Sequence, residues 1–422
     1  MKENNKRLKI AFFTPLKEGT KSFYFSKNIL PFLKEYCDID IFSDETIVET
    51  FCSLNVYHYK ASFLHNKEKK YDIFFYQVED SIDTNFCRLH LSLTKGVVFF
   101  HDYYVFTYPP QAIISSLVKE QCDNIKRDLG KALFSLTPSP FIIHKAKAYT
   151  RNNISSIYKN NITYLPYPLE DFNFKDNLNE KIIEKTNEKT NEKIKEQNKT
   201  IKILFEGSTS KDSRYFKMLR GVKNIKDSKL TWLTSKEEIE VAKKLCIDNG
   251  IKQFEVLENN FKNMKEAILK VDVAICLVKF LNHHNIFLIL NALKNGVFVI
   301  ANKLQNSYTF IDDLEIFPKN YIAKVSIGKT EEKEIEFFIN AYKDGKVMLD
   351  YKKLYEEYLI NFSSKYVAKD LYNLLLSISD DIKEFYKAFE KLELEARNKV
   401  LKKAFLKDDE YLKDAREELG LV

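Results

Sequence analysis

Residues 271–303, VDVAICLVKFLNHHNIFLILNALKNGVFVIANK, contain the pattern that decides the fold. The apolar run at 271–278 predicts a buried strand, the polar stretch at 282–285 predicts a loop, and apolar residues with helical spacing follow at 286–294. Asn295-Gly296 ends that helix, and the next apolar run predicts a second strand. Strand, helix and strand within about thirty residues are typical of a βαβ crossover in a buried parallel sheet.

The polar loop of this unit is a candidate binding site for an anion. It lies where the carboxyl end of the strand meets the N–H groups at the start of the helix, and α/β proteins bind phosphates at such positions. His283, His284 and Asn285 are the side chains that this loop offers. His283 and His284 are adjacent and have no third ligand nearby, so the sequence predicts no metal site here.

Strands and helices alternate in the same way on both sides of one charged segment. Strands are expected at 9–13, 39–42, 71–76, 97–101, 132–136 and 162–165 before it, and at 201–205, 230–233, 254–257, 271–278, 297–301 and 321–325 after it. Helical stretches such as 23–36 and 115–129 separate them. The alternation predicts an α/β protein of two doubly wound, Rossmann-like domains.

The segment at 173–200 separates the two halves. It consists almost entirely of Lys, Glu, Asn and Thr, repeats TNEK at 186–189 and 190–193, and has too few apolar residues to bury a face. It is therefore either a solvated helix or a mobile linker. The expected organisation is a first domain at 1–170, a linker at 171–200, a second domain at 201–361 and a helical C-terminal extension at 362–422.

Composition indicates a protein of the reducing interior of the cell. The 422 residues carry a formal charge of +7, a mild excess that would favour an anionic nucleotide or lipid surface but is no nucleic-acid signature. The six cysteines form no CxxC pair, which is typical of free buried thiols. Without a visible signal peptide or an apolar run of about 18 residues, a cytoplasmic location is expected, with or without peripheral contact to a membrane.

The end of the 271–303 unit resembles the donor-phosphate helix of GT-B glycosyltransferases, particularly the retaining family 4, also called group 1. There a helix and strand read EAMAxGxPVVA, and here residues 291–301 read NALKNGVFVIA. The resemblance implies two domains facing a cleft and transfer of a hexose from a UDP- or GDP-linked sugar to a glycan, glycolipid or protein acceptor. It also implies retention of configuration, no metal and no cofactor besides the nucleotide sugar.

The first half carries similar motifs. Residues 9–15, KIAFFTP, followed by Gly19, resemble the first strand and the substrate-binding loop of the family, although an ordinary βα turn would look the same. Residues 97–102, VVFFHD, resemble the strand end at which the family carries a His-Asp pair. His101 and Asp102 are therefore catalytic candidates, because an imidazole at a strand end can bind a sugar hydroxyl.

In the second half, residues 205–214, FEGSTSKDSR, match the family's glycine-bearing turn followed by a cation. Gly207, Lys211 and Arg214 are the substrate-binding candidates, with Arg214 preferred because a guanidinium grips phosphate with two donors. Glu258, at the end of another predicted strand, lies where the family holds the base or ribose.

The chain departs from the family at the donor helix. The family's two glutamates would fall at His283 and Asn291, neither of which is acidic. His283 is the third catalytic candidate, since it could supply a hydrogen bond to the reacting sugar, and Asn291 is a substrate-binding candidate that could accept one from ribose. This departure leaves two alternatives open, a catalytically inactive relative that binds a partner and a sugar-nucleotide 2-epimerase.

Other nucleotide and metal chemistries find no support. The chain has neither GxxxxGK[ST] nor GxGxxG, so neither a P-loop enzyme nor a dinucleotide oxidoreductase is indicated. Asp38 and Asp40 match the DxD of metal-dependent GT-A enzymes, but they lie in an alternating strand, which favours an edge strand of the sheet over a metal site.

Overall fold

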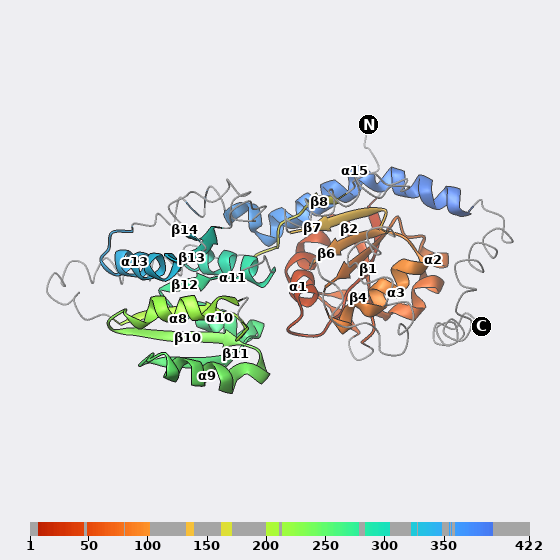
Figure 1. The fold of residues 1–422 in the computed structure, drawn as a ribbon. Coiled ribbons are helices and arrows are strands. Elements are labelled where there is room, and N and C mark those ends of the chain that lie inside the picture. The colour runs from red at the N-terminus through yellow and green to blue at the C-terminus, as the bar shows by residue number, and fades with distance from the viewer. Residues whose placement is uncertain are drawn as a thin grey trace. The chain divides into compact units, whose positions relative to one another are not determined.

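The structure is a computed structural model that divides the chain into two compact units (Figure 1). Unit 1 comprises Met1–Pro168 and Ser364–Val422, and unit 2 comprises Leu169–Ser363. The residues described are 7–45, 49–79, 81–101, 132–138, 162–170, 200–210, 213–277, 283–303, 322–326, 328–347, 354, 356 and 359–390. Each unit is built on its own largely parallel sheet, which confirms the predicted two-domain α/β class.

Unit 1 contains an eight-stranded sheet in the order β3-β4-β2-β1-β5-β6-β7-β8. The strands are β1 (Leu8–Phe13), β2 (Cys37–Ser43), β3 (Thr50–Phe51), β4 (Leu54–His58), β5 (Ile73–Val78), β6 (Val97–Phe100), β7 (Phe134–Thr137) and β8 (Ile162–Tyr164). All neighbouring pairs are parallel except β3 and β4. The chain order reverses between β1 and β5, so their carboxyl ends form the switch point at which doubly wound folds bind ligands.

The β3–β4 hairpin corrects the prediction that Asp38 and Asp40 lie in an edge strand. Their strand, β2, pairs with both β1 and β4 and is therefore internal. The hairpin turns at Cys52 and Ser53, whose φ angles are 52° and 61°. Two successive positive φ values are typical of a tight hairpin turn that usually carries Asn-Gly. Cys-Ser lacks that signature, so the sequence did not predict the hairpin.

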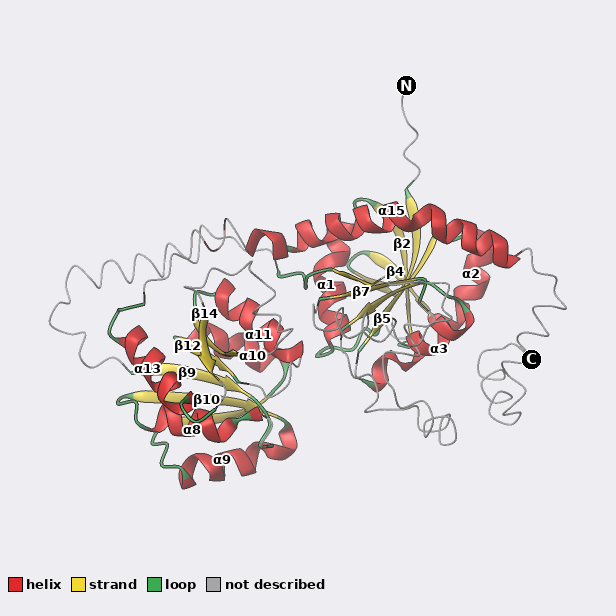
Figure 2. Cartoon of the chain, turned by 45° about the horizontal axis from the view of Figure 1, so that its top comes forward, coloured by secondary structure: helices red, strands yellow, loops and turns green. Residues whose placement is uncertain are grey.

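Helices cover both faces of the unit 1 sheet. They are α1 (Lys21–Leu33), α2 (Ser62–Lys69), α3 (Asn85–Leu93) and α15 (Ser364–Glu390), with short 3-10 turns η1 (Tyr59–Ala61) and η2 (Ile82–Thr84). Thr20 caps α1, since its hydroxyl accepts a hydrogen bond of 3.1 Å from the Phe23 N–H. The long α15 packs against α1 (Figure 2). Tyr36 stacks on Tyr372 of α15. The C-terminal helix thus returns to the first unit.

Unit 2 contains a six-stranded sheet in the order β11-β10-β9-β12-β13-β14. Its strands are β9 (Ile201–Glu206), β10 (Ser228–Thr234), β11 (Phe254–Glu258), β12 (Val273–Cys276), β13 (Phe298–Lys303) and β14 (Ile322–Ser326). Its helices are α8 (Tyr215–Lys223), α9 (Ile239–Asp248), α10 (Phe261–Lys270), α11 (His283–Lys294) and α13 (Glu331–Lys343), with η5 (Lys236–Glu238) and η6 (Leu359–Phe362). The switch point lies between β9 and β12.

The 271–303 segment forms β12, α11 and β13, as its pattern predicts. One boundary differs, because α11 begins at His283 and the expected loop residues 283–285 form its first turn. No Gly or Pro occurs among these residues, so nothing in them prevents helical backbone.

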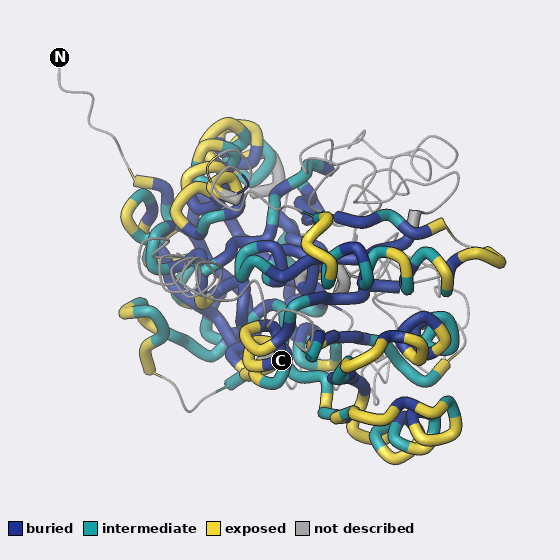
Figure 3. Tube along the Cα trace, turned by 90° about the vertical axis from the view of Figure 1, so that its left-hand side faces the viewer, coloured by how far each residue is buried: buried dark blue, intermediate teal, exposed yellow. Residues whose placement is uncertain are grey.

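The strands carry the core of each unit, and the outer faces of the helices are exposed (Figure 3). Trp232 and Phe205 are fully buried in unit 2, where their rings make an edge contact. Alternation of apolar residues along β9 and β10 places these rings on the face that α8 and α13 cover.

Several predicted segments fall outside the described residues. These are the helix at 115–129, the linker at 173–200 and the tail beyond residue 390. In the part of the chain that is described, no helix combines the length and the apolar content that crossing a bilayer requires.

Candidate functional site

The carboxyl edge of the unit 2 sheet is lined by polar groups that bind one another. Glu206 ends β9, and its Oε1 accepts a hydrogen bond of 2.8 Å from the Asn259 amide, which follows β11. The Asn259 backbone N–H in turn reaches the Thr234 carbonyl at the end of β10. The ends of β9, β10 and β11 are thus joined on one side of the switch point between β9 and β12, where a doubly wound sheet binds ligands.

The loop after β9 is held in a defined shape by β10 and η5. The Trp232 indole N–H donates to the Gly207 carbonyl at 2.7 Å. The Glu238 carboxylate accepts from the Thr209 N–H at 3.1 Å and from the Thr209 hydroxyl at 2.8 Å. Burial raises the pKa of Glu238, but hydrogen bonds from Thr209, Thr234 and Ser235 outweigh it and leave the pKa below its ordinary value.

Close packing leaves no room for a side chain at position 207, so this position requires glycine. A Cβ there would lie 2.8 Å from the Phe205 ring and 3.1 Å from the Ser213 Cβ. The predicted glycine-bearing turn is therefore a tight turn over the end of β9. Lys211, the second cation predicted for this loop, lies outside the described residues.

Arg214 follows this loop and precedes α8. Its backbone is left-handed, with φ 58° and ψ 23°, a conformation that non-glycine residues adopt at some energetic cost. Its Nε donates to Oε1 of Glu331 at 2.7 Å, and a terminal nitrogen binds Oε2 of the same carboxylate. The Asn302 amide, near the end of β13, adds a hydrogen bond of 3.0 Å to Glu331 Oε1. The predicted phosphate-binding cation therefore already has a forked partner.

The other candidates of unit 2 occupy separate elements. Glu258 ends β11 with an exposed side chain. His283, His284 and Asn285 start α11, which follows β12. Asn291 lies two turns further along α11 and is half-buried, and its backbone carbonyl accepts a hydrogen bond of 2.8 Å from the Asn295 side-chain amide. Each of these binding roles stays a prediction.

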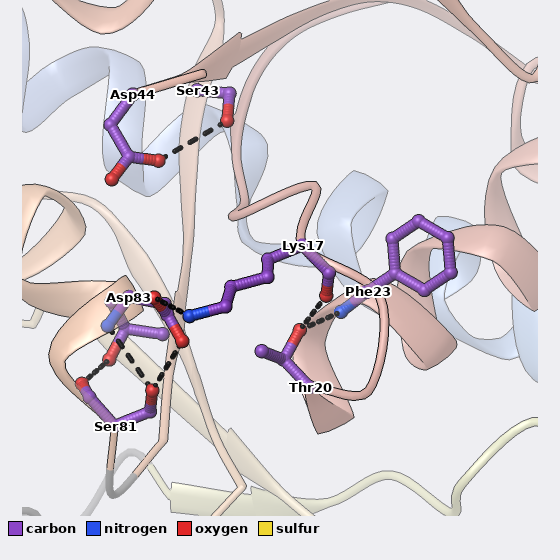
Figure 4. Close-up of polar contacts among 8 residues, drawn as sticks. Lys17, Thr20, Phe23, Ser43, Asp44, Ser81 and Asp83 are labelled. Atoms are coloured by element: carbon purple, nitrogen blue, oxygen red, sulfur yellow. Dashed lines mark hydrogen bonds and ion pairs between the residues drawn. The ribbon is translucent and has the colours of Figure 1, made fainter. Parts of the chain in front are cut away.

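The switch point of unit 1 is bridged by an ion pair. Lys17, in the loop after β1, lies 3.0 Å from Asp83, which follows β5, and the Ser81 hydroxyl donates to the same carboxylate at 2.8 Å (Figure 4). Gly19 lies in the same loop with a φ of +94°, which side-chain-bearing residues rarely adopt. Gly19 therefore sets the backbone conformation of the predicted substrate-binding loop, which lies at the switch point.

Carboxyl groups crowd around this ion pair. Burial raises the pKa of Asp44, at the end of β2, and the nearby Asp83 charge raises it further. Burial also raises the pKa of Glu45, with added repulsion from Asp44 and Asp83. Lys17 opposes both shifts. A hydroxyl-rich ligand would find several acceptors here, and one cation.

His101 lies beneath this edge rather than on it. Its side chain is fully buried, with Nδ1 at 2.7 Å from the Tyr167 hydroxyl and Nε2 at 2.8 Å from Oε1 of Gln77. Because the Gln77 amide nitrogen donates to Ser26, its oxygen faces His101, so Nε2 carries the proton and Nδ1 accepts from Tyr167. A sugar hydroxyl cannot reach the imidazole in this structure, and the catalytic role of His101 stays a prediction. Asp102 lies outside the described residues.

The DxD pair, Asp38 and Asp40, is engaged in ion pairs. Arg7 lies 3.1 Å from Asp38, while Lys69 and the Tyr71 hydroxyl bind Asp40 at 2.7 and 2.6 Å. The pair lines a pocket of about 740 Å³ at the amino ends of β1 and β2, opposite the switch point. Among the described residues, no three His, Cys, Asp or Glu side chains are grouped so as to hold a metal.

Sequence reasoning missed the residues that organise both edges. They are Lys17, Asp44 and Asp83 in unit 1, and Glu238, Asn302 and Glu331 in unit 2. Each lies at or shortly after the carboxyl end of a strand, or starts the helix or turn that follows. A polar residue at or shortly after the carboxyl end of a strand, the signal that predicted His101, marks all six of them in the sequence.

Known structures share the architecture of this chain. A glycosyltransferase from Rickettsia africae ESF-5 is similar to it with a TM-score of 0.56 and 14% identity, over 89% of this chain and 99% of that one. HepE from Anabaena, in complex with UDP and glucose, gives a TM-score of 0.51 and 11% identity, over 90% and 100%. Sucrose-phosphate synthase from Thermosynechococcus elongatus gives 0.50 and 10%, over 92% and 100%.

No protein-family model and no curated protein matches the sequence. The structural likenesses nevertheless extend over both units and over nearly the whole length of each similar protein. The chain therefore has the GT-B fold, as the residues at 291–301 led us to expect.

Proposed function

We propose that this protein is a glycosyltransferase that moves a sugar from a nucleoside diphosphate sugar to a glycan, glycolipid or protein acceptor. The observation that carries the proposal is the carboxyl edge of unit 2, where the Gly207 turn is held by Trp232 and Arg214 starts the helix that follows. The same fold holds UDP and glucose in HepE. A UDP- or GDP-linked hexose is the proposed donor, with no metal and no further cofactor.

Unit 2 is proposed to bind the donor diphosphate. Arg214 and Lys211 supply the cations, and the N–H groups at the start of α11 supply further donors. Catalysis in this proposal comes from stabilising the negative charge that develops on the departing diphosphate. Stabilising the leaving group in this way requires no carboxylate at the positions of the family's two glutamates. It is therefore compatible with His283 and Asn291 at those positions and with retention of configuration.

Unit 1 is proposed to bind the acceptor. The loop that contains Lys17 and Gly19, together with Asp44 and Asp83, offers hydrogen-bond acceptors and one cation around a switch point. These groups suit sugar hydroxyls. A glycolipid acceptor would also bring the protein to a membrane surface.

One observation favours a second candidate, a GT-B relative that binds a nucleotide or a partner without turnover. His101, the imidazole predicted to act on the sugar, is fully buried and bound through both nitrogens. Loss of this group together with the family's glutamates would leave binding intact and remove reactive groups.

A thermal-shift panel of UDP, GDP, CMP and their sugars tests the proposal. A ligand that binds only the folded state raises the melting temperature by mass action. We expect a shift with UDP or GDP and with one of the corresponding sugars, followed by slow hydrolysis of that sugar nucleotide. A shift without hydrolysis or transfer identifies the non-catalytic relative, and no shift with any nucleotide contradicts the glycosyltransferase and leaves the relative that binds a partner.

A further inference from the structure

The Arg214 guanidinium is fixed along one edge only. It has five N–H donors, of which the structure pairs the Nε donor and one terminal donor with the Glu331 carboxylate. The other three have no partner among the described residues. No Arg214 nitrogen is among the fully buried side-chain atoms that lack a partner there, and the side chain is 12% exposed. The second edge of the guanidinium therefore reaches the surface.

Glu331 rigidly holds the first edge of the guanidinium, which is formed by Nε and one terminal nitrogen. The side chain of Glu331 is 0% exposed, and Asn302 adds a third hydrogen bond to its carboxylate. A forked pair fixes the plane of the guanidinium as well as its position. The second edge, made of two parallel N–H groups, then points in one direction and matches the spacing of two phosphate or carboxylate oxygens.

Stability alone does not account for this arrangement. A buried ion pair generally stabilises a fold no more than apolar residues of similar volume would. Arg214 also adopts a left-handed backbone at φ 58°, which costs energy in a non-glycine residue. Two unfavourable features at one residue, on the edge of a doubly wound sheet where ligands bind, are typical of a functional position.

We infer that Glu331, assisted by Asn302, is a positioning residue for donor binding: it holds one edge of Arg214 so that the other edge receives the diphosphate. This inference rests on the proposed function. The Arg214–Glu331 pair as a whole is neutral, so the pair itself contributes directed hydrogen bonds to the diphosphate and no net charge. When Arg214 is removed alone, the buried Glu331 carboxylate remains and repels the ligand.

A double-mutant cycle on Arg214 and Glu331 tests the inference, with dissociation constants for UDP, GDP and inorganic pyrophosphate measured by calorimetry well below the melting temperature. Arg214→Gln should weaken binding about ten-fold or more, the usual value of lost charge-assisted bonds. Glu331→Gln alone should weaken binding by about three-fold or more, because Arg214 loses its fixed orientation, whereas adding Glu331→Gln to Arg214→Gln should cause no further loss, since contacting groups in one network are coupled. A purely structural role would change the melting temperature of Glu331→Gln but not its affinity.

Two further variants serve as controls. Arg214→Lys keeps the cation and the fold but cannot fork to two partners at once, so its affinity should lie between those of the wild type and Arg214→Gln. Lys217 and Glu332 form a matched ion pair of 2.6 Å between the same two helices. Lys217→Gln should leave the dissociation constant within about two-fold, the ordinary effect of a partly exposed pair.

Each remaining outcome is decisive. If the wild type binds UDP or GDP and Glu331→Gln binds them as tightly as the wild type, the positioning role of Glu331 is wrong while the proposed function stands. If the wild type binds neither nucleotide nor pyrophosphate, the proposed function and the inference are both overturned.

Discussion

The Tyr167 hydroxyl lies 2.7 Å from Nδ1 of His101, 66 residues earlier in the chain. Tyr167 is 2% exposed and immediately precedes Pro168, the last residue of unit 1 before the chain enters unit 2. His101 directly follows β6, so this hydrogen bond ties the end of a central strand to the exit segment of the unit. The pair stabilises unit 1 at the point where the chain leaves it.

Tyr167→Phe should therefore destabilise unit 1 without changing chemistry. It removes one hydroxyl and leaves the Nδ1 acceptor of His101 buried without that donor, at a cost of about 1–3 kcal/mol in the free energy of unfolding. Thermal unfolding followed by circular dichroism measures the loss, and the turnover number of the folded variant should stay within about two-fold of the wild type. A large fall in turnover with an unchanged melting temperature would instead make His101 catalytic.

Arg214→Met should strongly destabilise unit 2. Removing one partner of a buried ion pair leaves Glu331 charged and uncompensated, which costs about 3–5 kcal/mol. Trp232 is the only tryptophan of the chain and lies in the unit 2 core, so its fluorescence during urea unfolding reports this unit alone. The double variant Arg214→Met/Glu331→Leu should regain most of the lost stability, and a double variant as unstable as the single one would contradict the ion-pair account.

His90 should make unit 1 sensitive to acid. Burial lowers the pKa of His90 to about 3, and the ring binds the Ser62 hydroxyl at 2.6 Å and the Tyr76 hydroxyl at 2.9 Å. The unfolded chain takes up this proton near pH 6.5 and the folded chain only near pH 3. The stability contribution is therefore complete above pH 6.5 and declines as the pH falls from 6.5 towards 3, by roughly 1–2 kcal/mol down to pH 5.

Substitution at this position isolates the effect. His90→Gln should lower stability at pH 7 but flatten the dependence between pH 7 and pH 5, as measured by urea unfolding monitored with circular dichroism. His58 is the matched control, because burial lowers its pKa from a more exposed position. His58→Gln should leave the slope almost unchanged. An equally steep slope in His90→Gln would show that another group is responsible.

Lys17→Ala should separate function from stability in unit 1. The Lys17–Asp83 pair is solvent-exposed on the lysine side, and exposed ion pairs contribute about 0–1 kcal/mol. The melting temperature should therefore hardly change. If the loop after β1 binds the acceptor, the Michaelis constant for the acceptor should rise several-fold while the affinity for the donor nucleotide stays the same. Equal kinetics in Lys17→Ala would remove this loop from the acceptor site.

Gly207→Ala and Gly19→Ala should both perturb the protein, but for different physical reasons. Gly207→Ala would place a Cβ 2.8 Å from the Phe205 ring, so the loop before Arg214 must shift and nucleotide binding should weaken. Gly19→Ala meets no atom within 4 Å but has a φ of +94°, so it should cost about 1 kcal/mol in unit 1 through backbone strain alone. Gly345→Ala, with a φ of +69° and open space around it, is the strain control away from both sites. Unchanged nucleotide affinity in Gly207→Ala would contradict the role of this turn.

The sequence by itself determined the elements and the class of the fold. Largely apolar runs of four to eight residues predicted twelve of the described strands within a few residues of their observed bounds, because parallel strands buried on both faces must be mostly apolar. The unit at 271–303 appeared as strand, helix and strand for the same reason. The sequence did not predict the hairpin turn at Cys52-Ser53 or the start of α11 at His283. In both places the residues are not those that usually mark the backbone conformation found there.

Only the tertiary structure decided how the polar residues are paired. Arg214 and Glu331 are 117 residues apart, and no periodicity in either segment relates them. They meet because α8 and α13 cover the same face of the sheet, where Gly221 packs against Ile335. The structure likewise placed His101 inside a hydrogen-bonded network instead of at the surface. A side chain's residue type and its strand-end position are local properties, whereas its burial and its partners depend on which distant segments pack beside it.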